Sequence, residues 1–206
     1  MQDLIGPLDP HALQQGRALY NALPMLARIE YVTRLFSHWS VEEYGCIDGS
    51  YNIVVALRNG AWVAEIAASP RLNAVQVSAD HPYAAHTYQR NSHAVGIAVN
   101  GMTGATSDDF GAEPVQLHEI EVLCAANAAV AKKYSIDLAG MIGGEHALLT
   151  HAEAAILDGY FPGDGDPNSR WDLARLRASD APLTKAEAIA TGDLIRARSR
   201  AYKGAL

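Results

Sequence analysis

Histidine side chains are the residues of this sequence best suited to chemistry. The chain has eight of them in 206 residues. A neutral imidazole binds transition metals such as Zn²⁺, and it also exchanges protons near neutral pH. One histidine alone is more often structural than functional, but His38 stands at the polar tip of a predicted strand in RIEYVTRLFSHWS. Its significance depends on which other residues accompany it.

Five short motifs follow one another in the chain between about Arg28 and Leu176. They are LFSHWS, SYNIVV followed by RNG, AAHTYQRNSHAVGIAVNGM, LTHAEAA and RWDL. In this order they resemble the type 2 N-acetylmuramoyl-L-alanine amidases, the family of the T7-lysozyme-like phage amidases and the peptidoglycan recognition proteins. The resemblance covers most of the chain. It implies a zinc-dependent hydrolase that cuts the amide bond between N-acetylmuramic acid and L-alanine in peptidoglycan.

The resemblance implies three metal ligands, His38, His151 and Asp172, the last of which follows Arg170 by two residues. Two neutral imidazoles and one carboxylate suit Zn²⁺, and three protein ligands leave one coordination position for water. We therefore expect Zn²⁺ as the cofactor. Its chemistry would be to activate water and to polarise the carbonyl of the bond that is cut.

The same resemblance implies further site residues. Tyr51 and Arg170, where many family members carry a lysine, would donate to the developing oxyanion. His86 and Asn91 match a family segment that lines the substrate groove and orders the loop before the next strand. Glu153 is a candidate through its position alone, two residues after His151, as a proton carrier or a partner of a ligand. Each role has a simpler alternative: Tyr51 as an ordinary strand aromatic, and Arg170 and Glu153 as solvated charges.

The sequence departs from the family pattern in three places. Ala98 and Asn100 stand where several members carry a proton-handling glutamate, so the general base is not identified. Arg170 cannot release its proton as a lysine can, so its role would be electrostatic. The stretch DGYFPGDGDPNS lengthens the spacing between the last two ligands, which makes Asp164 or Asp166 a rival third ligand.

Hydrophobic periodicity and turn residues predict the elements that must position these side chains. We expect an α/β fold, a single domain with a mixed central β-sheet flanked by helices, as in the amidases and peptidoglycan recognition proteins. Asn59-Gly60, between two β-rich runs, predicts a type I′ hairpin. The predicted strands otherwise lie at about 29–38 and in HAVGIAVNGM, and the predicted helices lie at 11–24, 115–134, a turn or two within 170–178, and 184–202.

These elements divide the chain into an N-terminal helical extension (1–27), a zinc amidase domain (28–178) and a C-terminal helix (179–206). The last helix carries a cluster of basic residues, which we interpret either as a solvated face or as a patch for anionic polymers. They are Arg196, Arg198, Arg200 and Lys203.

Composition limits the partners. The net charge of -7 argues against binding to nucleic acid, and Cys46 and Cys124, outside any CxxC, predict buried thiols rather than a disulfide. The sequence has neither a secretory signal nor an apolar stretch of membrane-spanning length, so we expect synthesis in the cytoplasm and action as a monomer on peptidoglycan or muropeptides. A phage or prophage endolysin fits best. A recycling enzyme, a delivered toxin, a non-catalytic peptidoglycan-binding module and a zinc peptidase of the stem peptide are the alternatives.

Overall fold

The computed structural model describes residues 6–206, so the first five residues of the predicted extension 1–27 lie outside the described part of the chain. A mixed sheet of five strands has the order β3-β2-β4-β1-β7, in which only the β2–β3 pair is antiparallel. Its strands are β1 (Arg34–Trp39), β2 (Ile53–Arg58), β3 (Ala61–Ile66), β4 (Ala94–Val99) and β7 (Leu148–Thr150). The predicted α/β class with a mixed sheet is thereby confirmed.

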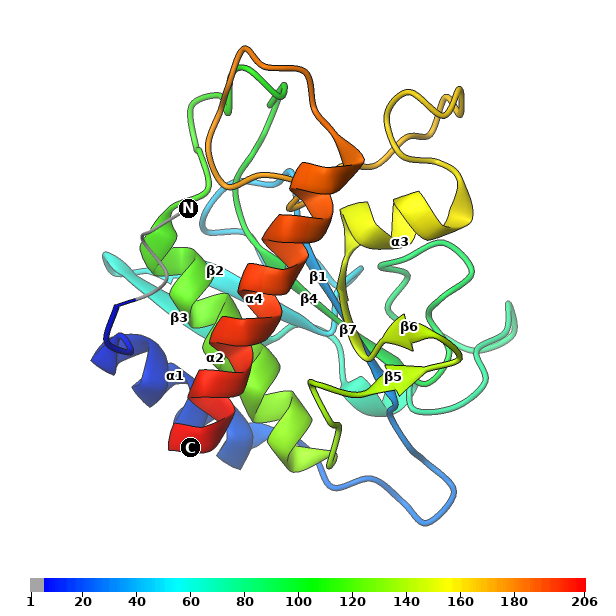
Figure 1. Ribbon diagram of the computed structural model, residues 1–206. Coiled ribbons are helices and arrows are strands. Elements are labelled where there is room, and N and C mark those ends of the chain that lie inside the picture. The colour runs from blue at the N-terminus through cyan, green and yellow to red at the C-terminus, as the bar shows by residue number, and fades with distance from the viewer. Residues whose placement is uncertain (1–5) are drawn as a thin grey trace.

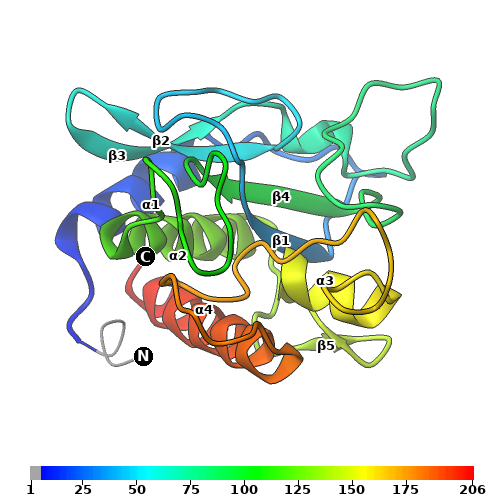
Figure 2. The same cartoon turned by 90° about the horizontal axis from the view of Figure 1, so that it is seen from above.

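Helices cover one face of this sheet (Figures 1 and 2). They are α1 (Pro10–Ala22), α2 (Leu117–Lys133) and α4 (Lys185–Ala205), whereas α3 (His151–Asp158) follows β7 at the edge of the sheet. A small ribbon of β5 (Met141–Ile142) and β6 (Glu145–His146) precedes β7. Figure 2 shows α1 and α2 beneath the sheet and α4 on the far side of α2. One hydrophobic core includes residues of α1, the sheet, α2 and α4.

Side chains of β1 alternate between the two faces of the sheet, as the pleat requires. Leu35 and Trp39 belong to the core shared with α2, and Ser37 hydrogen-bonds Asn127 of that helix. His38 therefore lies on the opposite face, which long loops cover. Phe36, on the same face as His38, packs with Ala154 of α3, so the surroundings of His38 are built from loops and the start of that helix.

Local sequence signals explain several boundaries. Asn59 and Gly60 have φ values of 50° and 81°, so the predicted hairpin is confirmed with both turn residues in the left-handed region. Asp9 caps α1, and Thr184 caps α4 by accepting a hydrogen bond from the amide of Glu187. Among the described residues, no helix is both long and apolar enough to cross a membrane.

Some predicted elements are wrong. β1 begins at Arg34 rather than near Ile29. The side chain of Ile29 is exposed and takes no part in the sheet. Residues 170–178 form turns and bends instead of a helix: Leu173 has a φ of 61°, and Arg175 donates to the loop carbonyls of Ser107 and Ala181.

Two predictions about which side chains are buried also need correction. Arg196 and Arg198 are buried rather than part of a solvated basic face, since Glu153 and Glu121 pair with them. Cys124 is buried as predicted. Cys46 is only half-buried.

Glu119, in the first turn of α2, predicts a pH dependence of folding. The residue is fully buried, and burial raises the pKa of its carboxyl group to about 9. Because the folded protein then binds a proton that the unfolded chain releases above its ordinary pKa of 4.5, stability should fall as the pH rises from about 5 to 9. Glu119→Gln should flatten this slope, measured as melting temperature at pH 5 and pH 8. An unchanged slope would contradict the assignment.

Candidate metal centre

Three separate segments bring His38, His151 and Asp172 together. His38 is the fifth residue of β1, and His151 is the first residue of α3, directly after β7. Because β7 pairs with β1 in parallel, with Thr150 opposite Ser37, the two histidines meet at the same end of neighbouring strands. Asp172 arrives from the loop after α3, and its carbonyl accepts a hydrogen bond from the amide of Ala152.

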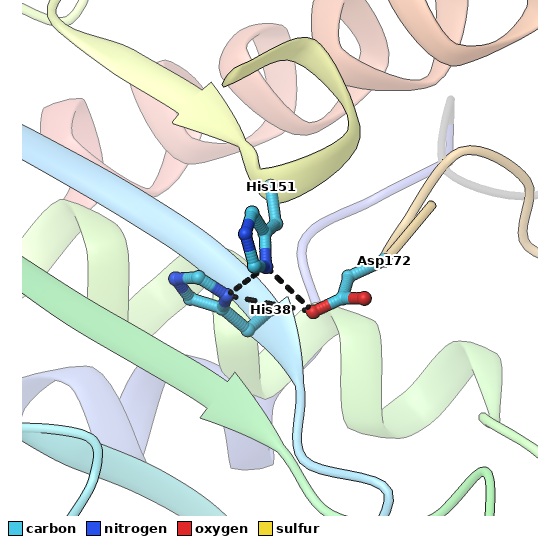
Figure 3. A group of neighbouring side chains, drawn as sticks. All are labelled: His38, His151 and Asp172. Atoms are coloured by element: carbon cyan, nitrogen blue, oxygen red, sulfur yellow. Dashed lines mark hydrogen bonds and ion pairs between the residues drawn. The ribbon is translucent and has the colours of Figure 1, made fainter. Parts of the chain in front are cut away.

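The three side chains present one ligand atom each to a common point (Figure 3). The Nδ1 atoms of His38 and His151 are 3.1 Å apart, and the Oδ2 atom of Asp172 lies 2.9 Å from Nδ1 of His151 and 3.5 Å from Nδ1 of His38. Ligands about 2.0–2.1 Å from a tetrahedral Zn²⁺ are about 3.3–3.4 Å apart. The observed separations bracket this value, so the residues fit a metal ion.

The protonation states also suit metal binding. Burial lowers the pKa of His38 to about 4 against the opposing hydrogen bond to Asp172, so its imidazole is neutral at physiological pH. Burial alone would raise the pKa of Asp172, but the charge of His151 and the hydrogen bonds to both histidines hold it below its usual value. An unprotonated imidazole and a carboxylate are the forms that a metal requires.

The rival aspartates lie elsewhere. Asp164 forms an ion pair with Lys185 at 2.6 Å, and Asp166 accepts a hydrogen bond from the amide of Asn168. Of the acidic residues in this region, Asp172 is the one whose oxygen meets the histidines. The preference for Asp172 over Asp164 and Asp166 therefore agrees with the geometry.

Tyr51 lies near this centre, and Arg170 is two residues before Asp172 in the chain. The ring of Tyr51 is 5.2 Å from that of His38, and burial, followed by the charge of Asp172, raises the pKa of its hydroxyl above the usual value. Tyr51 thus keeps its proton and serves as a hydrogen-bond donor. It precedes β2, so it is not the strand aromatic of the simpler interpretation. Arg170 is exposed and donates to the carbonyls of Asn168 and Ser169.

Glu153 has a different position from the one that the sequence suggests. Its carboxylate accepts a hydrogen bond from the amide of Thr150 and pairs with Arg196 at 2.8 Å, between α3 and α4. A Cβ atom on Gly192 would lie 2.1 Å from the Oε2 atom of Glu153, so α4 directly covers this carboxylate. Glu153 is therefore buried and paired, contrary to the interpretation as a solvated charge, and its contacts join two helices.

Ala98 and Asn100 stand where several family members carry a glutamate, and the structure gives each a role without proton transfer. Ala98 is the register partner of His38 in β4, so it adjoins the cluster with a side chain that handles no proton. Asn100 is buried, and its side-chain amide donates to the carbonyls of Tyr44 and Cys46. Asn100 therefore orders a loop.

Comparisons with known proteins add no identification. No family model matches this chain. A search of curated proteins and a search of solved structures likewise found no match. The resemblance to the type 2 amidases therefore stays a prediction based on the motifs. The assignment of the metal centre is based on the positions of its three side chains.

A groove of about 1400 Å³ opens beside the metal centre and is lined by parts of segments 76–92 and 158–170 together with Arg34 and His151. The side chain of His38 is fully buried, whereas those of His151 and Asp172 keep 8% and 12% of their surface exposed. Solvent and ligands therefore approach the cluster from the side of His151 and Asp172. His86 and Asn91 are among the lining residues, but both are buried, so their contact with substrate stays a prediction.

Two residues near the ligands were missed from sequence. Thr87 lies between His38 and His86, with its Oγ1 atom 3.3 Å from Nε2 of His38. The ring of Tyr160, which lines the groove, is 6.1 Å from that of His151. The neighbouring His86 could have pointed to Thr87, whereas the spacing of Tyr160 in the sequence carries no signal.

Proposed function

We propose that this protein is a zinc-dependent N-acetylmuramoyl-L-alanine amidase that acts on peptidoglycan as a phage or prophage endolysin. The observation that carries the proposal is the convergence of His38, His151 and Asp172, three ligands more than a hundred residues apart at the extremes, at the edge of a groove. The ordered motifs supply the substrate class.

The groove supports a polymeric or peptide-like substrate. Its volume of about 1400 Å³ is larger than that of ordinary small-molecule sites, which are about 300–1000 Å³. Tyrosines and side-chain amides in the lining offer stacking surfaces and hydrogen bonds to sugar and peptide groups, and they include Tyr83, Tyr88, Gln89 and Asn91. A strand of glycan with its stem peptide has this mixture of groups.

The residues around the centre take distinct roles in this proposal. His38, His151 and Asp172 would hold Zn²⁺, whose chemistry would be to acidify water and to polarise the amide carbonyl. The hydroxyl of Tyr51 keeps its proton and donates to the carbonyl of Trp39 in this structure. In the proposed reaction it would instead donate to the oxygen that gains negative charge. Arg170, at the groove wall, supplies a permanent positive charge. Arg90 also lines the groove, but it forms ion pairs with Asp158 and Glu145, so its positive charge is already neutralised.

Digestion of purified sacculi by zinc-loaded protein tests this function. An amidase releases new L-alanine amino termini and creates no new reducing sugars, as detected by end-group labelling and mass spectrometry. The control is Asp172→Asn, which keeps the shape of the side chain but removes a charged ligand, and should release nothing above background.

Other products would contradict the proposal in defined ways. A new diamino-acid or D-residue terminus would identify a zinc peptidase, and retention on sacculi without release would identify a binding module. Reducing ends would identify a glycosidase. None of these results is compatible with amidase activity.

A further inference from the structure

We infer that Thr87 is a positioning residue for the metal centre, because its hydroxyl links the far nitrogen of His38 to a second buried histidine, His86. The Oγ1 atom of Thr87 is 3.3 Å from Nε2 of His38 and 2.9 Å from Nδ1 of His86. All three side chains are at least 95% buried. The inference rests on the metal centre of the proposed function and not on the reaction.

The direction of these hydrogen bonds follows from which His38 nitrogen faces the metal. Nδ1 of His38 points at His151 and Asp172, so a neutral imidazole that ligates through Nδ1 carries its proton on Nε2. Nε2 then donates to the oxygen of Thr87, and the hydroxyl of Thr87 donates to Nδ1 of His86 when His86 carries its proton on Nε2. A ligand whose second nitrogen has a fixed acceptor keeps one tautomer and one ring orientation.

The surrounding loop holds Thr87 in place. Its amide donates to Oδ1 of Asn91 at 2.9 Å, and the backbone carbonyl of Asn91 accepts a hydrogen bond from the side chain of Asn73. Thr87, Asn91 and Asn73 are all buried. Asn91 thus acts on the centre through Thr87, which is a role beyond lining the groove.

Gly96 of β4 makes room for this arrangement. A Cβ atom at Gly96 would lie 2.2 Å from Cγ of His86, so the imidazole packs directly on the strand. Glycine weakens a strand interior and is expected there where another group must approach closely. The sheet therefore seats His86 at the distance from which it accepts the hydroxyl of Thr87.

Metal affinity of Thr87 variants tests the inference without any assay of turnover. Thr87→Val keeps the shape but removes the hydroxyl, and should lower the affinity for Zn²⁺ by about 10–100-fold, the usual effect of removing a group that supports a ligand. Thr87→Ser keeps the hydroxyl, so its affinity for Zn²⁺ should stay within about threefold of that of the parent protein, well short of the roughly tenfold loss expected for Thr87→Val. Competition with a chromophoric chelator measures both, and Thr33→Val, which removes a hydroxyl bonded to the carbonyl of His93, is the control.

His86→Phe provides a second route if Thr87→Val does not fold. It preserves an aromatic ring against Gly96 and removes the acceptor, so Zn²⁺ affinity should fall, and adding Thr87→Val should lower it little further because both changes break one chain of hydrogen bonds. Co²⁺-loaded variants should show altered visible bands. Parent-like affinity in Thr87→Val or His86→Phe, or a loss in Thr87→Ser equal to that in Thr87→Val, would overturn the inference, whatever the substrate proves to be.

Discussion

His151→Ala should abolish stoichiometric binding of zinc and all release of L-alanine termini, while the protein stays folded. His151 supplies one of three ligand atoms, and its removal leaves His38 and Asp172, which cannot define a tetrahedral site alone. The backbone at this position should persist, because Thr150 and Glu153 cap the start of α3 through their own side chains. Elemental analysis after dialysis measures the metal, and circular dichroism measures the fold.

His81→Ala is the matched control. His81 is an exposed histidine on the segment that lines the groove, and its ring contacts Ser78 rather than the metal centre. It should retain one zinc ion per chain. A full complement of zinc in His151→Ala would show that the ligand set is wrong, and an unfolded His151→Ala would show that the histidine has a structural role that the geometry does not reveal.

Arg196→Met should lower the free energy of unfolding by about 3–5 kcal/mol, the usual effect of removing one partner of a buried ion pair. The side chains of Arg196 and Glu153 expose 2% and 6% of their surface, and the guanidinium also donates to the carbonyl of Leu148 at the end of the sheet. Without Arg196, the charge of Glu153 is left buried between α3 and α4. Chemical denaturation measures the change.

Two further variants isolate the pair. Arg200→Met, an exposed position on the same helix, should change stability by no more than about 0.5 kcal/mol. Glu153→Gln combined with Arg196→Met should be less destabilised than the sum of the single changes, with a coupling on the order of 1–3 kcal/mol. Equal stability of Arg196→Met and Arg200→Met would refute the structural role of Glu153 and reopen its role in proton transfer.

The sequence indicated the three ligands because each stands in a motif. That the ligands lie close together in space depends on the pairing of two strands, which no local pattern reveals. His38 and His151 meet because β1 and β7 pair in parallel, yet β7 has only three residues and was not predicted. Such a short strand gives no periodic signal. The helix α3 was also missed, although Thr150 and Glu153 have capping-box spacing that could have revealed its start.

Long-range partners explain the other errors. Arg196 and Arg198 occupy positions in α4 that suit solvated cations, but Glu153 of α3 and Glu121 of α2 supply buried carboxylates from distant parts of the chain. The apolar pattern of residues 170–178 suits a helix, but the guanidinium of Arg175 instead binds the carbonyl of Ser107 in another loop and that of Ala181 further along its own loop. In both cases tertiary hydrogen bonds override the local preference.

A crystal structure of the zinc-loaded protein, with anomalous scattering recorded at the zinc edge, is the most direct test of the metal centre. We predict one strong peak per chain, about 2.0–2.1 Å from Nδ1 of His38, Nδ1 of His151 and a carboxylate oxygen of Asp172. A peak coordinated by Asp164 or Asp166 in place of Asp172, or a fully loaded protein with zinc bound elsewhere, would contradict it.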